Sequence, residues 1–124
     1  MPQHAIVIPV AELSLGLKRI VEVGRAIATA PELLLLDEPA AGLSAHERAM
    51  LGELLRTLRD QGMTILVVEH NVPFVRKYCD ELILLEAGAI AAHASLSVSE
   101  PLPDRLTAYL GYMPGHNPAD AAET

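Results

Sequence analysis

LLLLDEPAAGLS, residues 33–44, is the most informative stretch of this chain. Its four leucines form a short apolar run, and Pro39 interrupts any regular strand or helix because it lacks a backbone N–H. Such a run predicts a strand that is buried on both faces, as in a parallel sheet. Asp37 and Glu38 follow at the carboxyl end of that strand, the edge where open α/β sheets bind ligands. A solvated acidic turn is the simpler interpretation, so the flanking segments must decide.

The composition limits the classes of protein that fit. The chain has 124 residues, which suits one domain or part of one, and 51% of them are hydrophobic. A net charge of −7 argues against a nucleic-acid surface, which requires clustered Lys and Arg. The single cysteine, Cys79, cannot form an internal disulfide and fits a reducing compartment. No apolar run approaches the roughly 20 residues of a membrane-spanning helix, and the histidines lack metal-site spacing.

Helical and strand patterns alternate along the chain. The expected elements are helix 16–30, strand 33–36, helix 45–61, strand 64–68, a short helix ending at 78, strand 82–85, a hairpin arm at 89–93 and helix 103–110. Three strands that alternate with helices imply a parallel sheet with right-handed crossovers. Residues 1–10 form a short apolar segment without recognisable chemistry. Residues 112–124 are small and polar, so we expect a disordered tail.

Two serines precede predicted helices. Ser14, Gly16 and the free amides at the start of the helix together suit an anion, although an ordinary N-cap is the simpler interpretation of the serine. Ser44, with Glu47 three residues later, predicts a capping box. Gly62 is placed to end the second helix in a left-handed conformation.

Polar residues at two strand ends suit phosphoryl transfer to water. Asp37 could hold Mg²⁺, and Glu38 could orient or deprotonate the attacking water. His70 ends the neighbouring strand and could contact a γ-phosphate, although a single histidine at a strand end is more often structural. Because parallel strands end at the same edge, we expect the three side chains to meet there.

The order of these motifs resembles the second half of an ABC transporter ATPase. LSLGL at 13–17 is similar to the family's LSGGQ signature, and LLLLDE at 33–38 to Walker B with its catalytic glutamate. Gly42–Ser44 is similar to the D-loop and His70 to the switch histidine. The segments DEPAAGL, VEHN and AYLG resemble the branched-chain amino-acid subfamily in particular. Over about residues 12–111, the resemblance implies an α/β, partial P-loop NTPase-like three-layer fold with a mostly parallel sheet, flanking helices and a C-terminal β-hairpin.

The resemblance also implies a role for each residue at the two strand ends. Asp37 would act on Mg²⁺ through water, Glu38 would be the general base, and His70 would contact the γ-phosphate and switch the dimer. ATP and Mg²⁺ are the implied cofactors.

The signature and D-loop residues would face a second subunit. Ser14 and the amide of Gly16 would contact the γ-phosphate of an ATP held by that subunit, and Ser44 would lie at the dimer interface. Leu15 and Leu17 depart from the signature, replacing its first glycine and its glutamine, so the side-chain contacts of that glutamine are lost. Ser44 replaces the usual aspartate, which weakens the D-loop assignment.

A phosphate loop, G-x-x-x-x-G-K-S/T, is missing from this sequence. The resemblance therefore implies that residues 1–111 are the C-terminal part of a nucleotide-binding domain, whose N-terminal half with Walker A would be a separate partner. Backbone amides and the lysine of that loop supply most of the nucleotide affinity in such folds. We expect the chain alone to hydrolyse no ATP, to bind Mg-ATP weakly, and to expose apolar strand surface that drives self-association.

The leading functional hypothesis is the ATP-hydrolysing subunit of an ABC importer, for branched-chain amino acids or a related solute. Its partners would be a second ATPase subunit and the transmembrane permease, which would hold it peripherally on the cytoplasmic side of the membrane. No nucleic acid is expected. Two alternatives are an SMC-like DNA-repair ATPase, which the acidic charge and the lack of heptads disfavour, and a non-catalytic interaction half-domain, which the missing phosphate loop favours.

Overall fold

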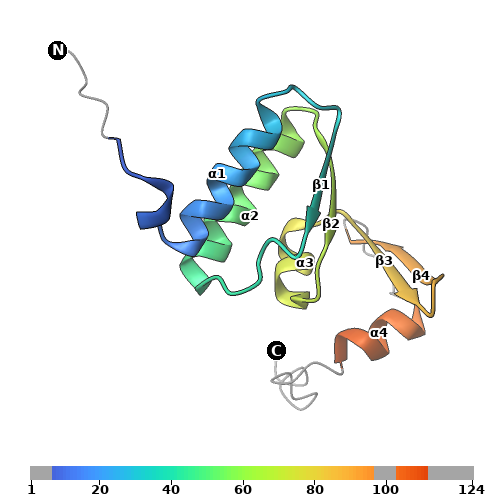
Figure 1. Cartoon of the computed structure of the whole chain (residues 1–124). Coiled ribbons are helices and arrows are strands. Elements are labelled where there is room, and N and C mark those ends of the chain that lie inside the picture. The colour runs from blue at the N-terminus through green and yellow to red at the C-terminus, as the bar shows by residue number, and fades with distance from the viewer. Residues whose placement is uncertain (1–6, 97–102, 112–124) are drawn as a thin grey trace. The chain divides into compact units, whose positions relative to one another are not determined.

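The chain divides into two units, Met1–Asn71 and Val72–Thr124, in the computed structural model (Figure 1). The structure describes residues 7–96 and 103–111. The predicted tail at 112–124 and most of the apolar segment at 1–10 therefore lie outside the described residues.

The first unit contains a parallel strand pair and two long helices. In chain order its elements are η1 (Val10–Glu12), α1 (Leu15–Ile27), β1 (Leu33–Asp37), α2 (Ala45–Asp60) and β2 (Thr64–Val68). β1 and β2 pair in parallel, with Leu33 opposite Thr64 and Asp37 opposite Val68. The predicted strands and the predicted helix between them are confirmed to within one residue. Helices α1 and α2 lie side by side (Figure 1).

Burial alternates along the parallel strand pair. Leu34 is only 4% exposed, whereas its neighbours Leu33 and Leu35 are 50% and 63% exposed. On β2, Leu66 and Val68 are 53% and 58% exposed. We call these four exposed residues, Leu33, Leu35, Leu66 and Val68, the open face. The expectation of strands buried on both faces is therefore met on one face only, because no described element of the first unit covers the other face. The expected exposed apolar surface is present in this unit.

Local signals set the ends of the helices. Ser14 and Ser44 are the N-caps, with Oγ atoms that accept hydrogen bonds from Leu17 N at 3.3 Å and from Glu47 N at 3.2 Å. The reciprocal half of the predicted capping box is not made, since Glu47 Oε2 is buried and has no hydrogen-bond partner in the described part of the chain. Gly62, with φ +98°, follows α2 as predicted.

Helix α1 ends three residues before the predicted end at residue 30. Its last residue is Ile27. Ala30 has a left-handed backbone with φ +50°. A residue that precedes proline is disfavoured in the helical region, and Pro31 follows here.

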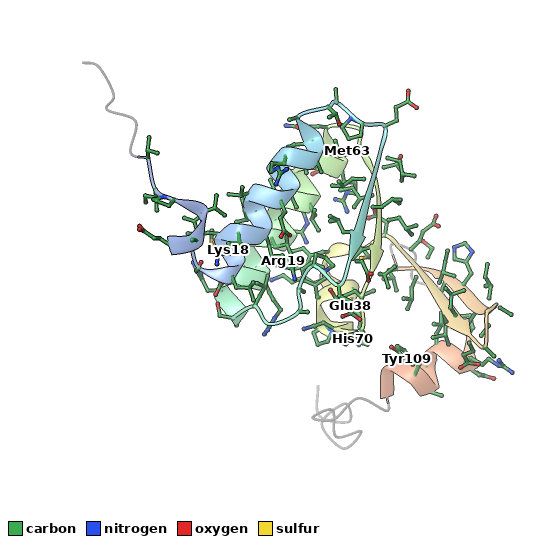
Figure 2. All side chains as sticks on the ribbon, in the orientation of Figure 1. Lys18, Arg19, Glu38, Met63, His70 and Tyr109 are labelled. Carbon is green, nitrogen blue, oxygen red and sulfur yellow. The ribbon has the colours of Figure 1, made fainter. Side chains whose placement is uncertain are left out.

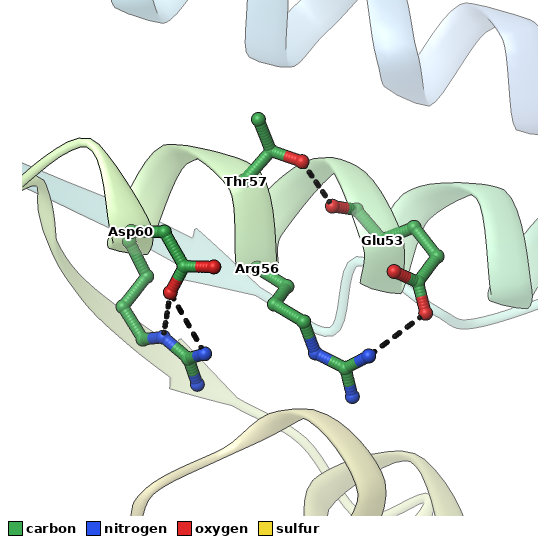
Figure 3. A network of polar contacts seen from close by, with 5 residues as sticks. Glu53, Arg56, Thr57 and Asp60 are labelled. Atoms are coloured by element: carbon green, nitrogen blue, oxygen red, sulfur yellow. Dashed lines mark hydrogen bonds and ion pairs between the residues drawn. The ribbon is translucent and has the colours of Figure 1, made fainter.

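Helix α2 has a buried leucine stripe and a charged surface. Leu51, Leu55 and Leu58 are at most 7% exposed, whereas the fourth predicted stripe residue, Leu54, is half-buried. Ion pairs and hydrogen bonds on this helix join Glu53 to Arg56 and Thr57, and Arg59 to Asp60 (Figure 3). Because exposed ion pairs contribute about 0–1 kcal/mol each, the leucine stripe dominates the packing of this helix.

The second unit is a β-hairpin with two short helices. Its elements are α3 (Val72–Tyr78), β3 (Glu81–Glu86), β4 (Ala89–Ser95) and α4 (Asp104–Gly111). Ala87 and Gly88 have φ values of +49° and +78°, which suit a two-residue hairpin turn. The expectation that the third strand joins the parallel sheet is wrong within the described residues, since β3 pairs only with β4. The tight turn brings the antiparallel arm directly beside β3, whereas a parallel neighbour requires a long crossover.

Helix α4 contacts β4 within this unit. Leu106 is fully buried, and Arg105 forms a 3.1 Å ion pair with Glu86. None of the described helices combines the length and apolarity that crossing a bilayer requires.

Candidate active-site edge

Glu38 and His70 meet where the two parallel strands end. Glu38 comes directly after β1, and His70 is the second residue after β2. Glu38 Oε1 lies 3.2 Å from His70 Nδ1, and Figure 2 shows the two side chains next to one another. The side chains are 48% and 68% exposed, so a ligand could reach both. The structure therefore brings together the carboxylate and the imidazole expected at one edge.

The backbone of Glu38 is unusual. Its φ of +47° lies in the left-handed region, which typically costs a residue other than glycine about 1–3 kcal/mol. Glu38 N donates a 2.7 Å hydrogen bond to Val68 O, the last residue of β2. Pro39 and Ala40 directly after it are buried. Such a backbone persists only where its surroundings fix it, and conformations of this kind cluster at active sites.

Asp37 is the last residue of β1, and it is exposed. Within residues 7–96 and 103–111, no three His, Cys, Asp or Glu side chains are grouped so that they could hold a metal ion. Mg²⁺ keeps several waters and is usually bound by one or two carboxylates together with substrate phosphates. Asp37 therefore fits a magnesium ion that arrives with a phosphate ligand, and does not fit one held by this chain alone.

The predicted signature and D-loop segments lie against each other at the start of the two helices. Gly16 is buried, and a Cβ atom built there would lie 2.6 Å from Glu47 Cγ on α2. Gly42 has φ +73°, and a Cβ atom there would lie 3.0 Å from Leu15 Cδ2 on α1. The close packing of α1 against α2 therefore explains the glycine at position 16 without a ligand.

The remaining predicted site residues form a separate group. The Oγ atoms of Ser14 and Ser44 cap their own helices. Among the described residues, no hydrogen bond or ion pair joins Ser14, Gly16 or Ser44 to the Glu38–His70 pair. The structure thus assembles two clusters: the Asp37, Glu38 and His70 edge, and the two helix starts.

Sequence reasoning missed Glu69. Its Oε2 accepts a hydrogen bond from Ala40 N at 3.1 Å, and its Oε1 accepts from His70 N at 3.1 Å and from Asn71 N at 3.2 Å. One carboxylate therefore bridges the loops after β1 and β2. Its position directly before His70, facing loop amides without strand partners, is the signal that could have found it.

Comparison with solved structures identifies the fold. An ATP-binding cassette of an ABC transporter, MJ1267 in its ADP conformation, matches 68% of this chain with a TM-score of 0.64 and 34% sequence identity. A nucleotide-free ATP-binding cassette matches 81% with a TM-score of 0.68 and 29% identity. The chain covers 33% and 37% of these two structures. The α/β fold with a small parallel sheet and a β-hairpin, expected from the sequence, is therefore confirmed.

Comparison with curated proteins gives relatives of the same kind. Nod factor export ATP-binding protein I of Rhizobium johnstonii is 46% identical over 79 residues, which are 64% of this chain and 25% of that protein. The high-affinity branched-chain amino acid transport ATP-binding protein LivG of Escherichia coli is 37% identical over 102 residues, 82% of this chain and 40% of that protein. No protein-family model matches the chain.

The two kinds of comparison agree with the motifs. The chain spans between a quarter and two fifths of the length of these curated relatives. Over the matched part it has the fold of the solved ATP-binding cassettes. The chain therefore belongs with the ATP-binding proteins of ABC transporters, as a homologue of part of their length.

Proposed function

We propose that this chain supplies the hydrolytic edge of an ATP-binding subunit of an ABC importer. The observation that carries the proposal is the 3.2 Å contact between Glu38 Oε1 and His70 Nδ1 at the shared end of two parallel strands. In a homologue of ABC transporter ATP-binding proteins, this pair fits a general base and a γ-phosphate contact.

The proposed chemistry is the hydrolysis of ATP to ADP and phosphate. Glu38 orients the attacking water and accepts its proton while the water oxygen bonds to the γ-phosphorus and the bond to the β–γ bridging oxygen breaks. His70 has Nδ1 toward Glu38, and in the imidazolium form both ring nitrogens are donors, so Nε2 would donate a hydrogen bond to the γ-phosphate in that form. Asp37 would hold Mg²⁺ through water, and the ion would neutralise negative charge on the phosphates.

The nucleotide-binding half must come from another polypeptide segment in this proposal. This sequence has no phosphate loop, so the β-phosphate and most of the binding energy depend on an N-terminal half with Walker A. The open face supports this inference, because apolar surface of this kind is normally covered by protein. Ser14, Gly16 and Ser44 would face a second ATPase subunit.

The transported solute is the finer part of the proposal. The LivG match extends over 102 residues and favours import of branched-chain amino acids. The match to the Nod factor export protein has a higher sequence identity, 46%, but extends over only 79 residues, and it favours an exporter. We propose the importer, bound through its permease to the cytoplasmic face of the membrane. The second candidate is the non-catalytic interaction half-domain, which the missing phosphate loop favours.

Reconstitution tests the proposal. The chain is mixed with a separately expressed N-terminal half of a homologous cassette, and Mg²⁺-dependent phosphate release is measured. We expect activity in the mixture, none in either half alone, and a loss of at least about 100-fold with Glu38→Gln. Glu32→Gln, an exposed glutamate just before β1, is the matched control and should retain activity. Stable binding of the two halves without hydrolysis would favour the interaction half-domain.

A further inference from the structure

The carboxylate of Glu69 joins two loops that are distant in sequence. It accepts one hydrogen bond from the loop after β1, donated by the amide of Ala40. It accepts two more from the turn after β2, donated by the amides of His70 and Asn71. All three donor–acceptor distances are 3.1–3.2 Å. Hydrogen bonds to an ionised acceptor are stronger than those between neutral groups. The two loops are therefore held at a fixed separation by one side chain.

The hydrogen bonds of Glu69 reach the backbone close to both members of the Glu38–His70 pair. Toward β1, the bonded amide of Ala40 is two residues after Glu38, and Ala40 is only 3% exposed. The Glu38 amide itself donates to Val68 O at 2.7 Å. Two hydrogen bonds therefore tie this segment to the end of β2, one from the amide of Glu38 and one from the amide of Ala40. Toward β2, the same carboxylate holds the amide of His70, whose ring faces Glu38.

We propose that Glu69 is a positioning residue, which holds the Glu38 carboxylate and the His70 imidazole opposite each other. Among the described residues, Glu69 forms no hydrogen bond or ion pair with either side chain, and it acts through the backbone on either side of the pair. Its effect on geometry stands independently of any activity, whereas its effect on turnover rests on the proposed function.

Glu69→Gln tests the bridge with almost no change in shape. A carboxamide offers one acceptor oxygen and one NH₂ donor, so it cannot accept amides at both ends. Hydrogen exchange followed by NMR should show the amide of Ala40, or those of His70 and Asn71, exchanging about tenfold faster than in the wild type. Glu32→Gln should leave all three unchanged, because Glu32 is exposed and its side chain forms no hydrogen bond or ion pair in the described part of the chain.

The tautomer of the His70 ring provides a second test, because loss of Glu69 would not change it if Glu69 only stabilised the fold. Because Nδ1 faces a carboxylate oxygen, we expect the neutral His70 ring to carry its proton on Nδ1. At about pH 9, ¹⁵N chemical shifts should report that tautomer in the wild type and a mixture of the two tautomers in Glu69→Gln. Glu38→Gln, which removes the facing charge directly, gives the reference spectrum.

Kinetics in the reconstituted mixture extend the test. Glu69→Gln should lower kcat about tenfold or more while KM for ATP stays unchanged, because the altered groups act in the reaction rather than in holding the nucleotide. Hydrolysis that fails in every mixture would overturn the proposed function and leave the exchange and tautomer results standing. Unprotected Ala40, His70 and Asn71 amides in the wild type would overturn the bridge. An unchanged His70 tautomer in a folded Glu69→Gln variant would overturn the positioning role.

Discussion

Glu38 shows how one residue can depend on several distant ones. Its carboxylate faces His70, its amide bonds to Val68, and its left-handed φ of +47° turns the chain out of β1. Neither the turn nor the strand alone would hold a glutamate in this conformation, because the left-handed region disfavours residues with a Cβ. The conformation of Glu38 therefore depends on the pairing of β1 with β2 as well as on the local sequence.

Position 16 gives a residue-scale prediction about stability. A Cβ atom there would overlap the Glu47 side chain, whereas a Cβ atom at Gly24, on the same helix, meets nothing within 4 Å. Alanine should help the helix at position 24 but crowd α2 at position 16. We expect Gly16→Ala to be less stable than Gly24→Ala by about 1–2 kcal/mol in urea denaturation.

A double-mutant cycle identifies the cause of that difference. In a Glu47→Ala background the overlap is removed, so Gly16→Ala should cost no more than Gly24→Ala does. An equal difference in both backgrounds would show that crowding by Glu47 is not the reason for glycine at position 16.

At the scale of the elements, the two long helices begin in the same way. Each starts directly after a serine whose Oγ accepts an amide three residues later. This geometry is local and explains why the helix starts could be predicted from sequence. The end of α2 is equally local because Gly62 follows it, whereas α1 ends at Ile27, three residues before the predicted end.

The cap of α2 gives an element-scale prediction. Ser44→Ala removes the acceptor for the Glu47 amide and should lower the stability of the chain by about 1 kcal/mol. Ser44→Asp keeps an acceptor at the N-cap and places a negative charge at the helix start, so it should be as stable as the wild type. Thermal unfolding followed by circular dichroism checks both, and equal losses in the two variants would contradict the cap.

At the scale of the whole molecule, the open face is a mismatch between an apolar sequence and low burial. Leu35 and Leu66 lie opposite one another in the strand register, and both are more than half exposed. Their side chains are typical of a sheet that is covered on both faces. In the proposed function, the N-terminal half of the cassette covers them.

This mismatch predicts self-association of the isolated chain. Sedimentation velocity should show concentration-dependent oligomers, and the Leu35→Gln/Leu66→Gln double variant should shift the distribution toward monomer. The variant should remain folded, because both side chains are already more than half exposed. Leu85→Gln, at a 68% exposed position on the hairpin, is the control. A monomeric wild type, or a response to the control alone, would contradict a role for the open face.

The sequence by itself determined the order of helices and strands, the serine caps, the Gly62 stop and the strand-end positions of Asp37, Glu38 and His70. Each of these depends on neighbours within a few residues, or on the rule that parallel strands end at one edge. Only the tertiary structure decided that β3 leaves the parallel pair, that Gly16 packs against Glu47, and that Glu69 bridges two loops. These features depend on which distant segments lie side by side, and hydrophobic periodicity carries no information about that.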